Sequence, residues 1–342
     1  NEPMAFSLQQ QGFEDTALTP SATEVYTKDN LGAGGIFNDD LLGSYYPIVI
    51  GHPGSEDVNT SPATNQSAGS PAYYLDSGGV ATHIIAGHHV EATKVTLRNV
   101  TANTSISADV TNGVDLTGQP IAYCAPTGAF TIALNDELRV TWNDGGFPFA
   151  VTGGLKNTEG PGALRGAGDV ILYFLGRSTI TWDRPKWNSI RDYLNQNFKI
   201  DAYIDEAVSP YEWLRDNIFP ILPLSIVYGV DGLKPILWRY DATPHDAVEN
   251  LISGAACSRN GSVLYEKQDL ANEIRLQYAL EASSSGTYTR TLTITGEERP
   301  TTSGVFSNTY SRASYNRFGS KQLEIESDVV YTESTAGSIL NW

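Results

Sequence analysis

The fold is decided by residues 201–240, DAYIDEAVSPYEWLRDNIFPILPLSIVYGVDGLKPILWRY, where the local signals are clearest. Residues 209–212, Ser-Pro-Tyr-Glu, have the composition of a helix start. The serine hydroxyl can cap free amides, the proline fits the first turn, and the glutamate can complete a capping box. Trp213, Leu214 and Ile218 then recur at helical spacing, which predicts that they share one buried face.

A hairpin is predicted directly after this helix. Pro220 and Pro223 are expected to end the helix, because proline lacks an amide hydrogen and clashes with the preceding turn. Two apolar runs follow at residues 224–228 and 235–240, and the Asp-Gly pair within residues 230–233 between them is a hairpin signal. The unit is a short amphipathic helix beside a β-hairpin, and we expect the rest of the chain to use similar α+β units.

The composition narrows the class of protein. At 342 residues the chain is long enough for two or three domains with a sizeable core. Only 18% of the residues are charged, and Gly, Ser, Thr and Asn take their place, which favours a β-rich and loop-rich protein. The 39 acidic and 22 basic residues give a net charge of −17. Such a chain repels phosphate, so we expect neither nucleic-acid readout nor docking on anionic lipid.

No membrane-spanning segment and no signal peptide are predicted, since no run of about eighteen apolar residues occurs. The two cysteines, Cys124 and Cys257, do not make a disulfide framework, and we interpret them as buried thiols, with a single bridge as the alternative. The chain begins at Asn1 and ends on an apolar, helix-like run at residues 336–342. We therefore expect both ends to continue in a longer polypeptide.

Four segments are predicted along the chain. Residues 1–40 are polar and glycine-rich and are expected to form an extended arm or linker. Residues 41–160 are expected to form a β-rich domain, residues 161–260 an α+β domain, and residues 261–342 a β-rich domain with the start of a C-terminal helix. The predicted fold class is therefore multidomain α+β, with a β-barrel or sandwich-like N-terminal domain followed by mixed α+β domains.

The individual elements are predicted from short-range patterns. Turn signals such as Asn112-Gly113 separate the strands of the β-rich segment, and the glycine-rich residues 153–168 mark a domain boundary. The strands of this segment are expected at residues 72–75, 82–86, 94–99, 105–110, 129–134 and 137–142. After the boundary we expect helices from residues 167, 183, 243 and 332, strands at residues 200–204, 274–280, 288–294 and 323–325, and a hairpin turn at residues 258–262.

Five histidines are the candidate metal ligands, since neutral imidazole binds zinc or iron. They are His52, His83, His88, His89 and His245. Alternation places His83 and His89 on one face of an extended strand, but Gly87 between them breaks the strand. No H-E-x-x-H motif occurs, and Cys124 does not belong to a C-x-x-C motif. We interpret the histidines as ordinary surface or interface residues and predict no metal and no cofactor.

No catalytic site is predicted. The adjacent pairs Asp39-Asp40, Asp205-Glu206 and Glu297-Glu298 are candidates for the two carboxylates of glycoside hydrolysis, but neighbouring strand residues point to opposite faces. The sequence has no G-x-S-x-G motif and no phosphate-binding loop. Several aromatic residues that could form a sugar platform are interpreted as core or interface residues. They are Trp182, Trp187, Trp213, Trp238, Tyr45, Tyr46, Tyr73 and Tyr74.

Several short motifs follow one another in an order that is typical of one family. In the second half they are residues 168–171, Trp187 with Tyr193-Leu194, Ile204-Asp205, residues 209–214, Leu237-Trp238, residues 269–274, Tyr278, and residues 314–319 and 331–336. In the first half they are residues 43–52, Tyr74-Leu75 and His83. In this order the chain resembles the baseplate hub, or tail tip, proteins of long-tailed bacteriophages and gene-transfer agents. The resemblance covers most of residues 41–342, and Phe318 stands where that family has a tyrosine.

The resemblance implies a structural virion protein without catalytic residues. Hub proteins of this kind assemble as a ring, usually a homotrimer, which closes the tail tube and contacts the distal tail protein and the tape measure protein. The ring also anchors tail fibre or spike proteins, which implies a place at the phage tail tip, assembly in the host cytoplasm and a role in host attachment. The alternative is an extracellular carbohydrate-binding or depolymerising β-protein, which needs an aromatic groove with two facing carboxylates.

Overall fold

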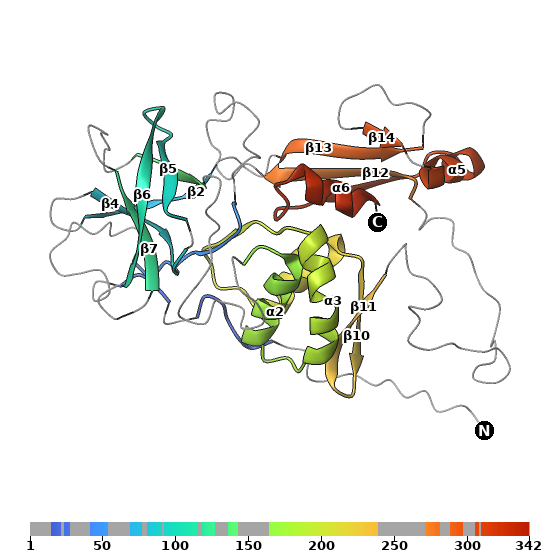
Figure 1. The fold of residues 1–342 in the computed structure, drawn as a ribbon, viewed down its shortest axis with the longest axis horizontal. Helices are drawn as coiled ribbons and strands as arrows, with labels where there is room; N and C mark the ends of the chain where they lie inside the picture. Colours follow the sequence, from blue (N-terminus) through green and yellow to red (C-terminus); the bar gives the residue numbers. More distant parts are fainter. Residues whose placement is uncertain are drawn as a thin grey trace.

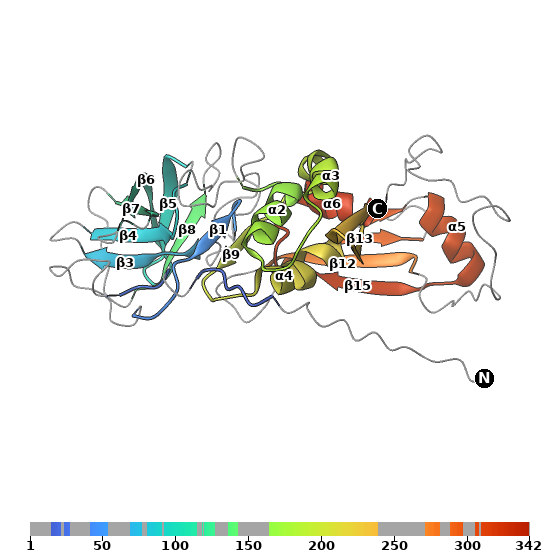
Figure 2. The same ribbon diagram turned by 90° about the horizontal axis from the view of Figure 1, so that it is seen from below.

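The computed structural model describes residues 15–21, 24–27, 42–53, 69–76, 81–90, 92–114, 118, 120–126, 136–142, 164–238, 271–280, 288–296, 305–307 and 309–341. Of these residues 27% are helical and 41% lie in strands, so the fold is mixed α+β, as the sequence predicts. Figure 2 shows a curled sheet at one end, the helices α2 (Ala167–Arg177) and α3 (Arg184–Asn197) in the middle, and a second large sheet at the other end.

The curled sheet is a half-barrel of seven antiparallel strands in the order β2-β8-β5-β6-β7-β4-β3. The strands are β2 (Ser70–Pro71), β3 (Tyr73–Asp76), β4 (Ala81–Ala86), β5 (Lys94–Asn99), β6 (Thr104–Val114), β7 (Pro120–Ala125) and β8 (Leu138–Trp142). In β5, Val95, Leu97 and Asn99 are buried and the residues between them are not, which is the period of a strand with one covered face. β6 pairs with β5 through its first half and with β7 through its second half.

One predicted turn in this sheet is wrong, and two strands, β2 and β7, are missing from the prediction. Asn112-Gly113 lies inside β6, because the Asn112 side chain bonds the backbone of Val90 and not its own. The side chain accepts the Val90 N–H at 2.9 Å and donates to the Val90 carbonyl at 2.7 Å. β2 has only two residues, and β7 opens on proline and has few β-branched residues. The strand predicted at residues 129–134 lies outside the described residues.

Helices α2 and α3 confirm the helices predicted from residues 167 and 183. α2 is apolar nearly all round and is buried in the middle of the molecule, where Ile171 and Phe174 have no exposed surface. α3 is amphipathic and buries Trp187. The carboxylate of Asp183 caps it by accepting the Lys186 N–H at 3.1 Å.

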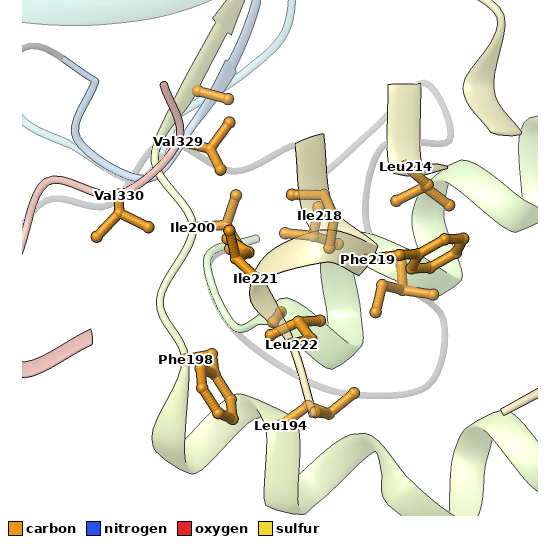
Figure 3. Packing of buried hydrophobic residues seen from close by; sticks show 14 of the residues in the cluster. Leu194, Phe198, Ile200, Leu214, Ile218, Phe219, Ile221, Leu222, Val329 and Val330 are labelled. Carbon is orange, nitrogen blue, oxygen red and sulfur yellow. The ribbon is translucent and has the colours of Figure 1, made fainter. Parts of the chain in front are cut away.

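The helix predicted after residue 208 forms, but it ends later than predicted. Its parts are α4 (Pro210–Trp213), the π-helical turn η2 (Leu214–Ile218) and the 3-10 turn η3 (Phe219–Ile221). Ser209 Oγ accepts the Glu212 N–H at 3.4 Å, as expected of a cap. Pro220 is accommodated inside η3, because a new turn begins there and does not need its amide hydrogen. Leu214 and Ile218 are buried as predicted, and Figure 3 shows both in the central core.

A two-stranded ribbon of β1 (Ile48–Ile50) and β9 (Ala202–Ile204) lies between the curled sheet and the helices (Figure 2). The first and last residues of each strand pack into the core of the helices. The middle residues, Val49 and its partner Tyr203, pack into the core of the curled sheet. Because side chains alternate along a strand, one ribbon contributes to two cores. The predicted β-rich and α+β segments are therefore joined by backbone pairing.

The buried carboxylate of Asp201 fixes the ends of this ribbon. Its Oδ1 accepts the His52 N–H at 2.7 Å and the Arg165 Nε–H at 2.8 Å, and its Oδ2 accepts from Arg165 Nη2 at 3.2 Å. The Asp201 N–H donates to the Val329 carbonyl at 3.0 Å. Gly51 has a φ of +61°, and a Cβ there would collide with Asp201 Oδ1. The Asp201 side chain thus links its own segment to those of His52 and Arg165, and its backbone N–H links it to the segment of Val329.

His88 attaches the same ribbon to the curled sheet. Its Nε2 accepts the Val49 N–H at 2.9 Å, and its Nδ1 lies 2.9 Å from the His89 carbonyl. Nε2 is therefore the unprotonated nitrogen, and Nδ1–H donates to His89. The ring is 2% exposed, which contradicts the interpretation of His88 as a surface or interface residue. The burial follows from its place where β1 crosses the sheet.

The described part of the predicted arm, residues 1–40, packs against the rest of the chain. Thr19 and Val208 exchange backbone hydrogen bonds of 2.9 and 3.0 Å. The ring of Tyr26 is buried 4.4 Å from the ring of Tyr46, in an edge-on arrangement. These contacts place the N-terminal segment along the ribbon and α4.

The second large sheet has the strand order β14-β13-β12-β15. Its elements and the helices around it are β12 (Glu273–Leu280), β13 (Tyr288–Thr295), β14 (Val305–Ser307), α5 (Thr309–Phe318), β15 (Gln322–Glu326) and α6 (Glu333–Asn341). α6 begins directly after Thr332, as predicted, and packs its apolar side on β12 and β13. The helix predicted from residue 243 and the turn at residues 258–262 lie outside the described residues.

The substitution Asp201→Asn should destabilise the whole molecule. It leaves the Arg165 guanidinium beside a neutral amide, and breaking a buried ion pair costs roughly 3 kcal/mol. Asp216→Asn is the matched control, because Asp216 pairs with Arg215 on the surface at 2.7 Å. The control should lose less than about 1 kcal/mol. Denaturant unfolding followed by tryptophan fluorescence measures both, and equal losses would contradict the anchoring role of Asp201.

Acid should destabilise the protein between about pH 6.5 and 4. Burial lowers the pKa of His88 from 6.5 to about 4, although its hydrogen bond to the His89 carbonyl acts in the opposite direction. The folded state therefore keeps the imidazole neutral while the unfolded chain binds a proton. Stability is complete above pH 6.5 and falls toward pH 4, by roughly 1.4 kcal/mol per pH unit for each such group. The variant His88→Gln should be less stable at pH 7, and its free energy of unfolding should depend less steeply on pH. An unchanged pH dependence would contradict the neutral, buried state of His88.

Candidate interaction surface

The histidines considered as metal ligands do not gather into a metal site. His83 is fully buried in β4 opposite Cys124 of β7, which contradicts its interpretation as a surface residue. Both faces of β4 are covered, by one apolar cluster around Ile84 and another around Ile85. Burial lowers the pKa of His83 to about 4, so the ring stays neutral. Among the described residues, no three His, Cys, Asp or Glu side chains gather as metal ligands would, and His245 lies outside them.

Among the described residues, the thiol of Cys124 and the carboxylates of Asp205 and Glu206 lie in different surroundings. Cys124 is buried and outside any disulfide, as interpreted from the sequence, and burial raises the pKa of its thiol to about 12. Asp205 and Glu206 are exposed side by side after β9. The remaining residues of this kind, Cys257, Asp39-Asp40 and Glu297-Glu298, lie outside the described ranges.

Trp238 differs from the other aromatic residues that the sequence singles out. Trp187 is buried and donates its indole N–H to the Leu233 carbonyl at 3.0 Å, and Trp213 stacks on Phe174 with ring centroids 4.4 Å apart. Trp187 is therefore a core residue, as predicted, and Trp213 is half-buried against the core. Trp238, in contrast, exposes 54% of its surface at the end of a hairpin.

This hairpin consists of β10 (Leu224–Gly229) and β11 (Gly232–Leu237), joined by a two-residue turn, which confirms the predicted hairpin. Its inner face packs on the central core through Leu224, Ile226 and Leu237. Figure 1 shows it beside α3. Half of the large apolar side chains that are exposed among the described residues belong to it. They are Val227, Tyr228, Val230, Ile236 and Trp238.

We call Val227, Ile236 and Trp238, with Val230 at the turn, the outer hairpin face. Strand alternation places Val227 and Ile236 opposite the inner residues, and both are exposed. The Trp238 indole N–H donates to Ser225 Oγ at 2.7 Å, so the polar end of the ring is satisfied while its apolar surface remains exposed. The outer face thus exposes a group of apolar side chains beside Ser225 and Lys234, and exposed apolar side chains that gather in this way can mark protein–protein interfaces.

The hairpin is held firmly against the N-terminus of α3. The Leu233 N–H donates to the Thr181 carbonyl at 2.9 Å, and the Leu233 carbonyl accepts from the Asp183 N–H at 3.0 Å. Lys234 Nζ lies 3.5 Å from Asp183 Oδ2. Gly232 has a φ of +101°, and a Cβ there would collide with the Thr181 carbonyl. The outer face is therefore presented in one orientation, which lowers the entropy lost when a partner binds.

The sequence contains a signal for this surface. Consecutive apolar residues occur in both strands, Ile-Val-Tyr at residues 226–228 and Pro-Ile-Leu-Trp at residues 235–238, whereas a half-covered hairpin alternates apolar with polar residues. The pattern predicts burial on both faces. In the described residues only the inner face is covered, so the outer face is the one that remains for a partner.

Alanine at Gly232 should loosen the hairpin more than alanine at Gly319. Gly319 has a φ of +72° with open space around it, so Gly319→Ala adds backbone strain alone, about 1 kcal/mol. Gly232→Ala adds the same strain and a collision with the Thr181 carbonyl, for a total of roughly 2 to 3 kcal/mol. Thermal unfolding of both variants measures the difference, and equal costs would show that the hairpin is not held by Thr181.

No protein-family model, curated protein or solved structure matches the chain. None of the helices in the described ranges has the length and apolar character needed to span a bilayer. Among the described residues, the outer hairpin face combines an apolar sequence, which predicts burial, with exposed side chains.

Proposed function

We propose that this chain is a structural virion protein, the baseplate hub at the tip of a phage tail, with a multidomain α+β architecture. The order of its motifs supports this proposal, and so does the curled β-sheet followed by α+β layers. The observation that carries it is the outer hairpin face, whose apolar side chains are rigidly held and are not covered by any described segment. A protein that is permanently assembled needs such a surface, because obligate interfaces resemble a core cut in half.

The outer hairpin face is best suited to contact another copy of the same chain. Each copy carries a net charge of −17, so copies repel one another at long range. Contact between them must therefore come from burial of apolar surface, and Val227, Ile236 and Trp238 provide it. In a homotrimeric ring each subunit places this face against a different surface of its neighbour.

The ring has further partners in this proposal. It closes the tail tube, contacts the distal tail protein and the tape measure protein, and anchors tail fibre or spike proteins that attach to the host. The protein is then a component of the virion that is assembled in the host cytoplasm. It is not an enzyme in this role, and it needs no cofactor.

The exposed ring of Trp238 also favours the second candidate, an extracellular carbohydrate-binding or depolymerising protein, because sugars stack on aromatic faces. The same face also carries Ser225 and Lys234, but the Ser225 hydroxyl already accepts the indole N–H and Lys234 pairs with Asp183 and Asp231. Assembly accounts for Val227, Ile236 and Trp238 together, whereas sugar stacking accounts for Trp238 alone. We therefore prefer the hub.

The assembly should depend on the outer hairpin face. Sedimentation of the wild-type chain at micromolar concentration should show three times the mass of one chain. The double variant Ile236→Ser with Trp238→Ser should sediment as a monomer with an unchanged circular dichroism spectrum. Val114→Ser is the control, because Val114 is an exposed apolar residue of the other sheet, and it should stay assembled. A monomeric wild type, or a control that dissociates equally, would refute the proposal.

A further inference from the structure

β15 forms one edge of its sheet. It pairs in parallel with β12, and among the described strands no other pairs with it. The Lys321 carbonyl accepts the Glu273 N–H at 3.0 Å, and the Ser327 N–H donates to the Gln277 carbonyl at 3.0 Å. Figure 2 shows β15 along the outer side of this sheet.

The direction of the outward backbone groups follows from these two bonds. Along a parallel strand, alternate residues direct both N–H and C=O to opposite sides. Since Lys321 and Ser327 face β12, Leu323 and Ile325 do so as well, in agreement with the register of the pair. The backbone groups of Gln322, Glu324 and Glu326 therefore point away from the sheet. They form a row of donors and acceptors that another strand can pair with.

The side chains of β15 differ between the two faces of the sheet. Leu323 and Ile325 lie on the face that α6 covers, and Leu323, at its margin, is 45% exposed. Glu324 and Glu326 lie on the opposite, exposed face. The carboxylate of Glu324 already pairs with Arg275 of β12 at 2.9 Å, which shows the cross-strand contact that a cation can make there.

The same charges select the partner. If β15 paired with β15 of a second copy, Glu324 and Glu326 would lie beside carboxylates, and like charges on adjacent strands are destabilising. A strand that alternates basic and apolar residues meets complementary side chains on both faces. Its cations lie beside Glu324 and Glu326, and its apolar residues extend the apolar face beside Leu323.

We propose that the β15 edge is a strand-addition site for an extended segment of a partner protein that alternates lysine or arginine with apolar residues. The added strand pairs with the backbone of Gln322, Glu324 and Glu326. This site goes beyond the proposed hub function, because it lies on a different sheet from the outer hairpin face and its test does not require a ring.

The first test uses a short fluorescent peptide that alternates lysine and valine, titrated against the full chain and followed by fluorescence anisotropy. The control peptide has glutamate in place of lysine. Its affinity should be lower by roughly tenfold or more, because two cross-strand charge pairs are lost. A second control carries N-methyl groups on the residues that pair with the edge, and it should not bind. Equal binding of the lysine and glutamate peptides would overturn the charge argument, and so would no binding of the lysine peptide.

The second test separates backbone pairing from charge within the protein. Glu324→Pro and Glu324→Gln remove the same carboxylate, but only the proline also removes an outward N–H, and it leaves the bonds to β12 intact. Glu324→Gln should weaken lysine-peptide binding a few-fold, and Glu324→Pro should abolish it. Circular dichroism and thermal unfolding show whether each variant folds. If the proline variant does not fold, the N-methylated peptide tests backbone pairing in its place. Equal binding by both variants would overturn strand addition, and loss of self-association in Glu324→Pro would assign the edge to a second copy.

Discussion

The pairing of β1 with β9 is the constraint on which the rest of the structure depends. The ribbon has three residues in each strand, too few to be stable by itself in water. The buried carboxylate of Asp201 holds its end through Arg165 and His52, and the ring of His88 holds its middle through the Val49 amide. A slip of one residue would exchange the side chains that face the two cores, so these polar contacts also determine the register.

This arrangement explains why two surfaces of different chemistry can remain exposed on one chain. The hairpin is fixed by backbone bonds at Leu233 and by the indole of Trp187, so its outer face stays presented without further support. One edge of β15 is paired with β12. Beside its other edge, the exposed face of the strand carries Glu324 and Glu326. An apolar face suits contact between like-charged copies, whereas an acidic strand edge suits a basic strand. In a chain with a net charge of −17, these are complementary ways of binding partners.

Periodicity in the sequence predicted the elements that are long or have clear boundaries. α2, α3 and the β10–β11 hairpin were predicted because apolar spacing, the Asp183 cap and the Asp-Gly turn are local signals. β7 and the interior position of Asn112 were not predictable, since they depend on Val90 and on neighbouring strands. Pro220 did not end the helix as predicted. It lies in the first residues of a new 3-10 turn that begins at Phe219, directly after the buried Ile218.

The sequence by itself determined that the fold is mixed α+β and where the elements with clear local signals lie, such as α2, α3, α4 and the β10–β11 hairpin. The tertiary structure alone decided that His83 and His88 are buried, that β1 pairs with a strand more than a hundred residues away, and that one hairpin face and one strand edge have no covering neighbour among the described residues. The physical reason is that local periodicity specifies which side chains avoid water. Which neighbour covers them depends on packing between segments that are distant in sequence, and no local pattern records it.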